Sequence, residues 1–262
     1  MYDLASITRG RRARPPRIIL TGVEKIGKST FAAGAENPIF IPVEGEEGVD
    51  DLDVPAFPPV TSIDEMIMAL NTLITDDHDY QTVVIDSTSA LEPIIWRDVA
   101  KIHNVDSIEL VLKGYGKGYV EALKEWRTIM DALDYLRNSK NMACILIGHV
   151  KVKRFDDPTA EAYDQYQWDI NDKASAAMTR WADFMGFTNT KTLVKKEDVG
   201  FNKTKKKGTL TNHRYLFTKP SAAYPAGGRG PYGRLPGEIL LPGEDPWGAF
   251  MDAVTAACGE IA

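Results

Sequence analysis

Residues 17–31, RIILTGVEKIGKSTF, decide the fold of this chain. Residues 17–21, which are apolar at 18–20, predict a short buried strand, and a helix is expected to begin at Thr30. Between them, residues 22–29 match the pattern G-x-x-x-x-G-K-[ST] at every position. A strand before this pattern and a helix after it are the context that a phosphate-binding loop, or P-loop, requires. The stretch therefore favours a P-loop over the alternative of a chance glycine turn.

The residue types of this loop suit a nucleoside triphosphate and its metal ion. Gly22 and Gly27 permit backbone angles and a close approach that a side chain would block. Backbone N–H groups and the helix N-terminus attract phosphate oxygens. Lys28 is expected to reach the β- and γ-phosphates, and the Ser29 hydroxyl to ligate Mg²⁺. The predicted ATP-binding residues are Gly22, Val23, Glu24, Lys25, Ile26, Gly27, Lys28, Ser29 and Thr30.

A second candidate position follows another apolar strand. In residues 81–91, QTVVIDSTSAL, the strand ends at Asp86. Ligands of open α/β sheets bind at the carboxyl ends of the parallel strands. Together with the P-loop upstream, this position predicts that Asp86 is the acid that orients Mg²⁺ beside Ser29.

The order of elements predicts the fold class. Apolar strands are expected at residues 38–43, 82–85, 142–148 and 183–188, and further helices at residues 62–74, 90–103, 119–139, 173–182 and 247–257. Strands alternate with helices up to His149, which predicts an α/β fold with a mostly parallel sheet flanked by helices. Residues 190–196 and 212–219 are expected to extend it as an antiparallel hairpin.

Three remaining segments complete the predicted organisation. Residues 104–119 and 151–172 are expected to be loops, the first rich in glycine and the second long and polar. A loop as long as residues 151–172 inside a compact domain is usually functional or disordered. Residues 1–16 predict a flexible basic arm, and residues 17–262 a single domain.

Charge is unevenly distributed along the 262 residues, whose formal net charge is −6. Residues 185–235 contain eleven Lys and Arg but only two acids. This asymmetry predicts a face that binds a polyanion. Four lysines fall on the expected turn of the hairpin, where a solvated tip is the alternative: Lys203, Lys205, Lys206 and Lys207.

Composition also bounds the cellular setting. No apolar run is long enough for a transmembrane helix, and the basic N-terminus lacks the apolar core of a secretory signal. Cys144 and Cys258 are the two cysteines, which argues against a disulfide framework and predicts a reducing cytoplasm.

These features together resemble the RecA-type P-loop ATPases, and among them the short phage-encoded ATPases of single-strand annealing and recombination. The resemblance covers residues 17–235 and rests on the P-loop, VVIDSTSAL, and the polar residues Glu44 and His149 that follow strands. It implies a RecA-like domain that hydrolyses ATP with Mg²⁺. Glu44 would activate the attacking water, with Glu46 and Glu47 as alternatives, and His149 would sense the γ-phosphate.

The resemblance also implies partners. Such proteins bind single-stranded DNA, here in the host cytoplasm if the chain is phage-encoded, and a single-strand binding protein is a possible further partner. Residues 104–119 and 151–172 would be the DNA loops. Acids in the second loop argue against phosphate contact there. The aromatics of the two loops would either stack on bases or pack on the loop's own base: Tyr115, Tyr119, Tyr163, Tyr166 and Trp168.

A ring or filament of identical subunits is implied as well. In such an assembly a neighbour supplies positive charge to the γ-phosphate, and the candidates are Lys219 and Arg229, each with a plain surface charge as the alternative. Three other functions stay open on the sequence: a P-loop kinase of a nucleotide or small molecule, a helicase or loader-type motor with the same core, and a nucleotide-gated scaffold with negligible turnover.

Overall fold

The protein was analysed as a computed structural model, which describes residues 3, 7, 9, 10, 14–159, 161–198 and 204–259, with the backbone alone at 192–198 and 204–212. Nine strands within these ranges form one sheet, whose main order is β2-β3-β4-β1-β6-β7-β9. The strands are β1 (Arg17–Gly22), β2 (Pro38–Pro42), β3 (Thr82–Asp86), β4 (Ala143–Phe155), β5 (Tyr163–Trp168), β6 (Phe184–Asp198), β7 (Thr204–Phe217), β8 (Gly227–Gly228) and β9 (Glu238–Leu241).

The sheet is mixed in the way that the sequence predicts. β1 lies at its centre and pairs in parallel with β4 and β6, while β2, β3 and β4 continue the parallel part. β7, β8 and β9 pair antiparallel to their neighbours. The predicted α/β class, a mostly parallel sheet with an antiparallel extension, is therefore confirmed.

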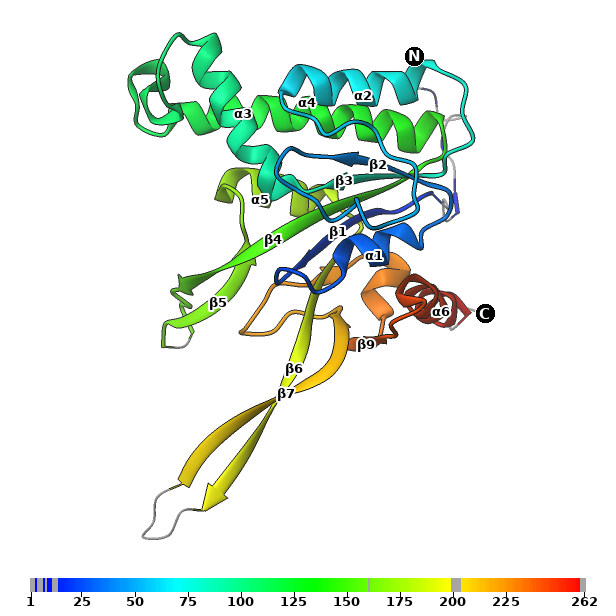
Figure 1. Ribbon diagram of the computed structural model, residues 1–262, viewed down its shortest axis with the longest axis vertical. Helices are drawn as coiled ribbons and strands as arrows, with labels where there is room; N and C mark the ends of the chain where they lie inside the picture. The colour runs from blue at the N-terminus through cyan, green and yellow to red at the C-terminus, as the bar shows by residue number, and fades with distance from the viewer. Residues whose placement is uncertain are drawn as a thin grey trace.

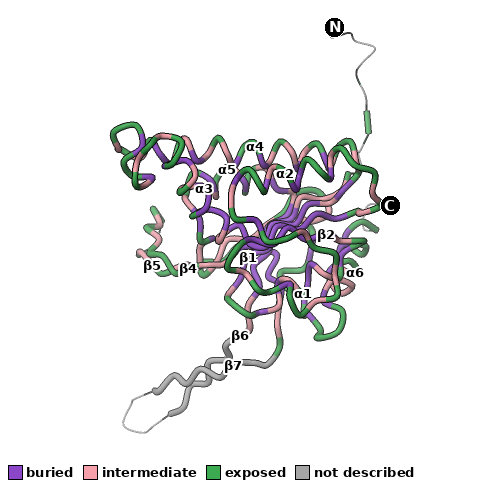
Figure 2. The backbone as a smooth tube through the Cα atoms, turned by 45° about the horizontal axis from the view of Figure 1, so that its top comes forward, coloured by how far each residue is buried: buried purple, intermediate pink, exposed green. Residues whose placement is uncertain are grey.

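Helices cover both faces of the sheet (Figure 1). They are α1 (Lys28–Ala33), α2 (Ile63–Thr75), α3 (Thr88–Ile102), α4 (Lys117–Ser139), α5 (Asp172–Trp181) and α6 (Pro246–Gly259), with short 3₁₀ turns η2 (Ile108–Lys113) and η3 (Gly230–Arg234). Successive residues of a strand point to opposite faces. Ile19 accordingly packs with α2–α5, and Ile18 and Leu20 pack with α1 and α6. Figure 2 shows the buried positions concentrated along these strands.

Two strands extend further than the sequence predicts. β4 continues past His149 to Phe155 and pairs with β5, so residues 151–172 are largely an antiparallel hairpin and not a loop. β6 is likewise one strand of 15 residues and not two. Lys205, Lys206 and Lys207 lie on β7 and not on a turn, while Lys203 lies outside the described residues. A strand that continues beyond the helices that cover a sheet has no core to pack against, so its sequence need not show the apolar alternation that marks a strand.

The segment 104–119 is also more regular than expected. It contains the 3₁₀ turn η2, and α4 begins at Lys117, so Tyr119 is helical. Leu112 and Lys113 at the end of η2 and Tyr115 after it have positive φ angles of 51°, 68° and 57°. None of the helices in the described ranges combines the length and the apolar character needed to cross a membrane.

Three residues before Arg17 are hydrogen-bonded to the rest of the protein. Arg14 donates to Asn138 (3.2 Å), Arg137 donates to the Pro15 carbonyl (2.6 Å), and the Cys144 N–H donates to Pro16 (2.9 Å). The last residues of the predicted flexible arm are therefore fixed to α4 and β4. Positions 3, 7, 9 and 10 are the other described residues of that arm.

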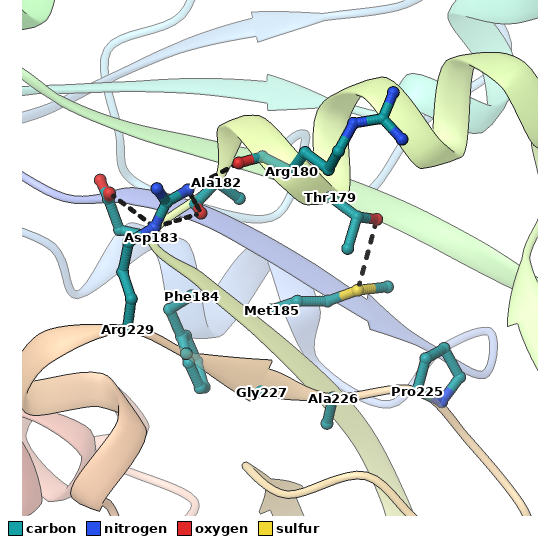
Figure 3. Close-up of a pocket in the computed structure, with 11 residues that line it drawn as sticks. Thr179, Arg180, Ala182, Asp183, Phe184, Met185, Pro225, Ala226, Gly227 and Arg229 are labelled. Atoms are coloured by element: carbon teal, nitrogen blue, oxygen red, sulfur yellow. Dashed lines mark hydrogen bonds and ion pairs between the residues drawn. The ribbon is translucent and has the colours of Figure 1, made fainter.

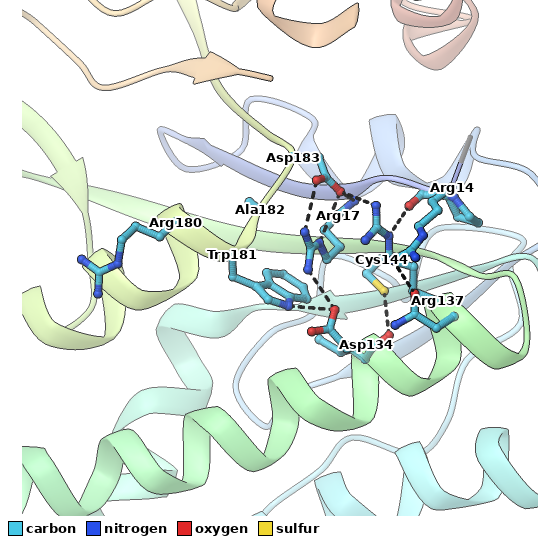
Figure 4. A network of polar contacts seen from close by, with 12 residues as sticks. Arg14, Arg17, Asp134, Arg137, Cys144, Arg180, Trp181, Ala182 and Asp183 are labelled. Carbon is cyan, nitrogen blue, oxygen red and sulfur yellow. Dashed lines mark hydrogen bonds and ion pairs between the residues drawn. The ribbon is translucent and has the colours of Figure 1, made fainter. Parts of the chain in front are cut away.

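An ion-pair network closes this edge of the sheet (Figure 4). Asp183 accepts from Arg17 (3.2 Å) and Arg137 (3.0 Å), and Arg17 also pairs with Asp134 (3.0 Å). Burial alone would raise the pKa of Asp183, but the hydrogen bonds and charge of Arg17 outweigh it and lower the pKa. The network joins β1, α4 and the start of β6, which fixes the central strands from the end opposite the P-loop.

Candidate functional site

Three adjacent parallel strands bring the predicted site residues to one edge of the sheet. The P-loop follows β1, Asp86 ends β3, and His149 lies on β4 opposite Gly22. A cleft of 710 Å³ opens there. It is lined by Glu24, Lys25, Ile26, Gly27, Lys28, Ser29, Thr30, Gly45, Glu46, Glu47, Gly48, Asp51, Asp86 and His149.

Glycine is required at the two motif positions of the P-loop for different steric reasons. Gly27 caps α1 with a φ of 93°, in the left-handed region that favours glycine. A Cβ on Gly22 would lie 2.1 Å from the Thr188 hydroxyl oxygen on the neighbouring β6. The first glycine therefore serves close strand packing and the second the turn into the helix.

Lys28 points back along the loop from the first turn of α1. Its side chain is buried, and Nζ donates to the carbonyl oxygens of Gly22 (3.2 Å) and Val23 (2.9 Å). Burial lowers the pKa of Lys28, and the carboxylates of Asp86 and Glu46 partly oppose that shift. The amine is thus a buried cation with carboxylates nearby, held where a phosphate would compete for its hydrogens.

Ser29 and Asp86 fit a divalent cation. The Ser29 hydroxyl donates to Asp86 Oδ2 at 2.5 Å, and Asp86 is 3% exposed. Burial raises the pKa of Asp86, against the opposing effects of the Ser29 hydrogen bond and of Lys28. A hard oxygen-binding ion such as Mg²⁺ would favour the ionised form of this carboxylate. Gly48 lies against the pair, because a Cβ there would be 2.8 Å from Ser29 Oγ.

The acid that reaches this centre from the β2 side is Glu46 and not Glu44. Glu44 is exposed, its N–H donates to the Val60 carbonyl, and its side chain does not line the cleft. The chain then turns at Gly45, whose φ is 89°, and the turn directs Glu46 inward. Glu47 also lines the cleft.

Glu46 is held by two side chains. Its Oε1 accepts from the Ser87 hydroxyl (2.6 Å) and lies 2.8 Å from Nε2 of His149. Burial would raise the pKa of Glu46, but the hydrogen bonds from His149 and Ser87 lower it. The carboxylate therefore remains an ionised acceptor at neutral pH. Ser87 directly follows Asp86 in VVIDSTSAL, one of the stretches on which the resemblance rests, but the sequence assigned it no role in holding Glu46.

His149 connects the cleft with the structure beyond it. Its N–H donates to Ser89 on α3 (3.0 Å), and its carbonyl accepts from Asp169 after β5 (2.9 Å). The sequence predicted that His149 ends its strand, but β4 continues to Phe155. His149 instead marks the point where β4 leaves β1 and pairs with β5. The side chain that touches Glu46 is thereby attached to the base of a hairpin.

Lys219 and Arg229 do not line the cleft. Arg229 donates to the carbonyls of Arg180 (2.7 Å) and Trp181 (3.0 Å) at the end of α5, beside a 330 Å³ pocket at the other edge of the sheet (Figure 3). Lys219 donates to the carbonyl of Gly233. The guanidinium of Arg229 is thus committed to capping a helix.

Comparison with known families agrees with this geometry. A family model described as an AAA domain matches residues 14–230, a span that includes every lining residue of the cleft. No curated protein matches the chain.

Proposed function

The chain belongs to the AAA domain family of P-loop ATPases, and on that premise we propose that it hydrolyses ATP in the cleft between the P-loop, Asp86 and Glu46. The observation that carries this proposal is the convergence of Lys28, Glu46 and Asp86 on one cleft, with Glu46 kept ionised. The fold alone supports nucleotide binding, whereas an oriented acid supports turnover.

Each residue has a role that follows from its contacts. Lys28 exchanges its two carbonyl acceptors for phosphate oxygens, and the loop N–H groups bind the same phosphates. Ser29 and Asp86 would hold Mg²⁺, which neutralises phosphate charge when bound. Glu46 accepts a hydrogen bond from the attacking water and orients it, since phosphoryl transfer depends mainly on positioning and electrostatics. Ser87 and His149 fix the direction of the carboxylate.

A matched pair of variants tests this assignment. Glu46→Gln should bind ATP with little change and release phosphate about 10²-fold more slowly, a loss typical of removing one positioned acid–base group. Glu44→Gln, two residues away, should hydrolyse ATP at the normal rate. Phosphate release and binding of a fluorescent ATP analogue measure the two effects. Normal turnover in Glu46→Gln, or a loss in Glu44→Gln, would refute the role of Glu46.

The finer proposal concerns DNA. We propose that the protein functions as RecA-like proteins do: it binds single-stranded DNA and assists annealing or recombination. The basic region supports this, because Lys195 lies opposite Lys207 and Lys196 opposite Lys206 in the register of β6 and β7. Like charges directly opposite one another destabilise a strand pair, and a phosphate backbone would relieve that repulsion.

The proposed assembly is a homo-oligomer with ATP between subunits. Lys219 is the candidate for the positive charge supplied by a neighbour, because Arg229 is committed to α5. A ring and a filament both satisfy this arrangement.

A further inference from the structure

The base of the β6–β7 hairpin touches both motif glycines of the P-loop. Thr188 on β6 occupies the space where a Cβ of Gly22 would be and donates to the Thr21 carbonyl (2.9 Å). Arg214 on β7 does the same at Gly27, where a Cβ would lie 2.2 Å from its Nη1. The phosphate-binding turn is therefore packed at both ends against one hairpin.

Arg214 approaches the P-loop from outside the cleft. Its Nη1 donates to the Ile26 carbonyl (3.4 Å) and its Nη2 to the Pro242 carbonyl (3.4 Å). Arg214 is not a lining residue of the cleft. A P-loop binds phosphate with inward N–H groups, and Arg214 takes a carbonyl of that loop from the opposite side.

Two cations therefore hold successive parts of the same loop. Lys28 holds the carbonyls of Gly22 and Val23, and Arg214 holds that of Ile26. To bind phosphate, Lys28 must release the carbonyls of Gly22 and Val23, whereas Arg214 keeps its hydrogen bond to the Ile26 carbonyl. Arg214 is then the cation that continues to hold the Ile26 carbonyl beside Gly27, whose φ of 93° lies in the left-handed region that favours glycine.

We infer that Arg214 is a positioning residue of the nucleotide site, through which the base of the β6–β7 hairpin holds the P-loop in its phosphate-binding geometry. The inference rests on the proposed nucleotide binding and adds a residue outside the cleft to it. The effect falls on binding and not on the chemical step, because the guanidinium contacts a carbonyl of the P-loop and does not line the cleft that contains Glu46.

Replacing the guanidinium tests the inference. Arg214→Met, which keeps the length of the side chain, should weaken binding of both ADP and an ATP analogue about tenfold, the scale of one lost hydrogen bond to a charged group. KM for ATP should rise by a similar factor, while kcat at saturating ATP stays unchanged. Arg214→Lys keeps a charged donor and should recover part of the affinity.

Arg234 is the matched control, because it also donates to a backbone carbonyl, that of Ala257 (3.1 Å), but far from the cleft. Arg234→Met should lower the thermal midpoint as much as Arg214→Met without changing nucleotide affinity. Wild-type affinity in Arg214→Met, an equal affinity loss in Arg234→Met, or a fall in kcat with unchanged KM would each overturn the inference. Failure of the unaltered protein to bind any nucleotide would overturn the proposed function together with it.

Discussion

Two hairpins leave the sheet at the edge that carries the cleft, and they differ in charge and in attachment. The β4–β5 arm pairs residues 150–155 with 163–168, and the β6–β7 ribbon pairs residues 192–198 with 204–210 (Figure 1). Residues 192–198 and 204–210 of the ribbon pair with each other, and the other pairings of β6 and β7 lie outside these ranges. The ribbon follows a register shift between Thr190 and Thr192, next to Arg214.

The base of the β4–β5 arm is buried and hydrogen-bonded. Trp168 is 3% exposed and donates to the Thr88 hydroxyl (3.2 Å), in space left free by the absence of a Cβ on Gly148. Tyr166 packs against Phe187, with ring centroids 5.3 Å apart. Both aromatics therefore pack on the base of the arm, which favours that alternative over stacking on DNA bases.

Charges in the arm are neutralised by its own neighbours. Arg154 lies opposite Asp164 in the register. Lys151 pairs with Asp169 (2.8 Å) and Lys153 with Asp172 (2.9 Å). The ribbon instead places lysines opposite lysines at two successive positions. The ion pairs of the β4–β5 arm thus balance its lysines, whereas the two lysine pairs of the ribbon are the feature on which our proposal of a DNA path along the ribbon rests.

The largest expected effect concerns Glu92, which anchors the arm from α3. Its Oε2 accepts from the Asn171 N–H (2.7 Å), and burial raises its pKa to about 7 from an ordinary value of 4.5, with Lys151 opposing and Asp169 reinforcing the shift. The folded protein therefore binds this proton more tightly than the unfolded chain. Stability from this group is full below pH 4.5 and is lost as pH rises through about 7, a change of about 3 kcal/mol.

Glu92→Gln removes this titration while keeping the acceptor. Between pH 5 and pH 8, the range that spans the shifted pKa, the variant should show a flatter free energy of unfolding in urea than the unaltered protein, and at the upper end it should be the more stable of the two. Glu244→Gln, at an exposed carboxylate, should keep the original slope. If the free energy of unfolding depended on pH equally in Glu92→Gln and in the unaltered protein, protonation of the buried Glu92 carboxyl would not stabilise the fold.

The next effect concerns the ribbon. Replacing Lys195, Lys196, Lys206 and Lys207 by Ser should weaken binding of a labelled single-stranded oligonucleotide about 10²-fold, or about 2.7 kcal/mol. The slope of log K against log salt should fall by about 3, since each lost phosphate contact removes about 0.7. Fluorescence anisotropy over a salt series measures both. An unchanged affinity and slope would exclude the ribbon as the DNA path.

The smallest expected effect concerns two lysines of the β4–β5 arm, which serve as a control for the lysines of the ribbon. Lys151→Ser with Lys153→Ser removes two exposed ion pairs and should change the free energy of unfolding by less than about 1 kcal/mol. Oligonucleotide affinity and its salt slope should stay unchanged. A loss comparable with that of the ribbon variant would return the DNA path to the β4–β5 arm and break the distinction between the two hairpins.

Sequence reasoning placed the P-loop, Asp86 and the alternation of strands and helices correctly. These features depend on neighbouring residues and on the parallel order of the strands, both of which a sequence displays. It chose Glu44 over Glu46 because Glu44 directly follows β2, and only the turn at Gly45 shows which acid points inward. It also missed the extent of β4 and β6, whose outer parts have no core to mark one face.

The amino-acid sequence by itself determined that this chain builds a P-loop at the centre of a mainly parallel sheet, because glycine, lysine and serine at fixed spacing act within a single turn. The tertiary structure decided which distant groups surround that loop. Glu46, His149 and Arg214 come from separate elements, and their meeting depends on strand order, register and loop path. Those quantities result from packing the whole sheet, so no local pattern of residues contains them.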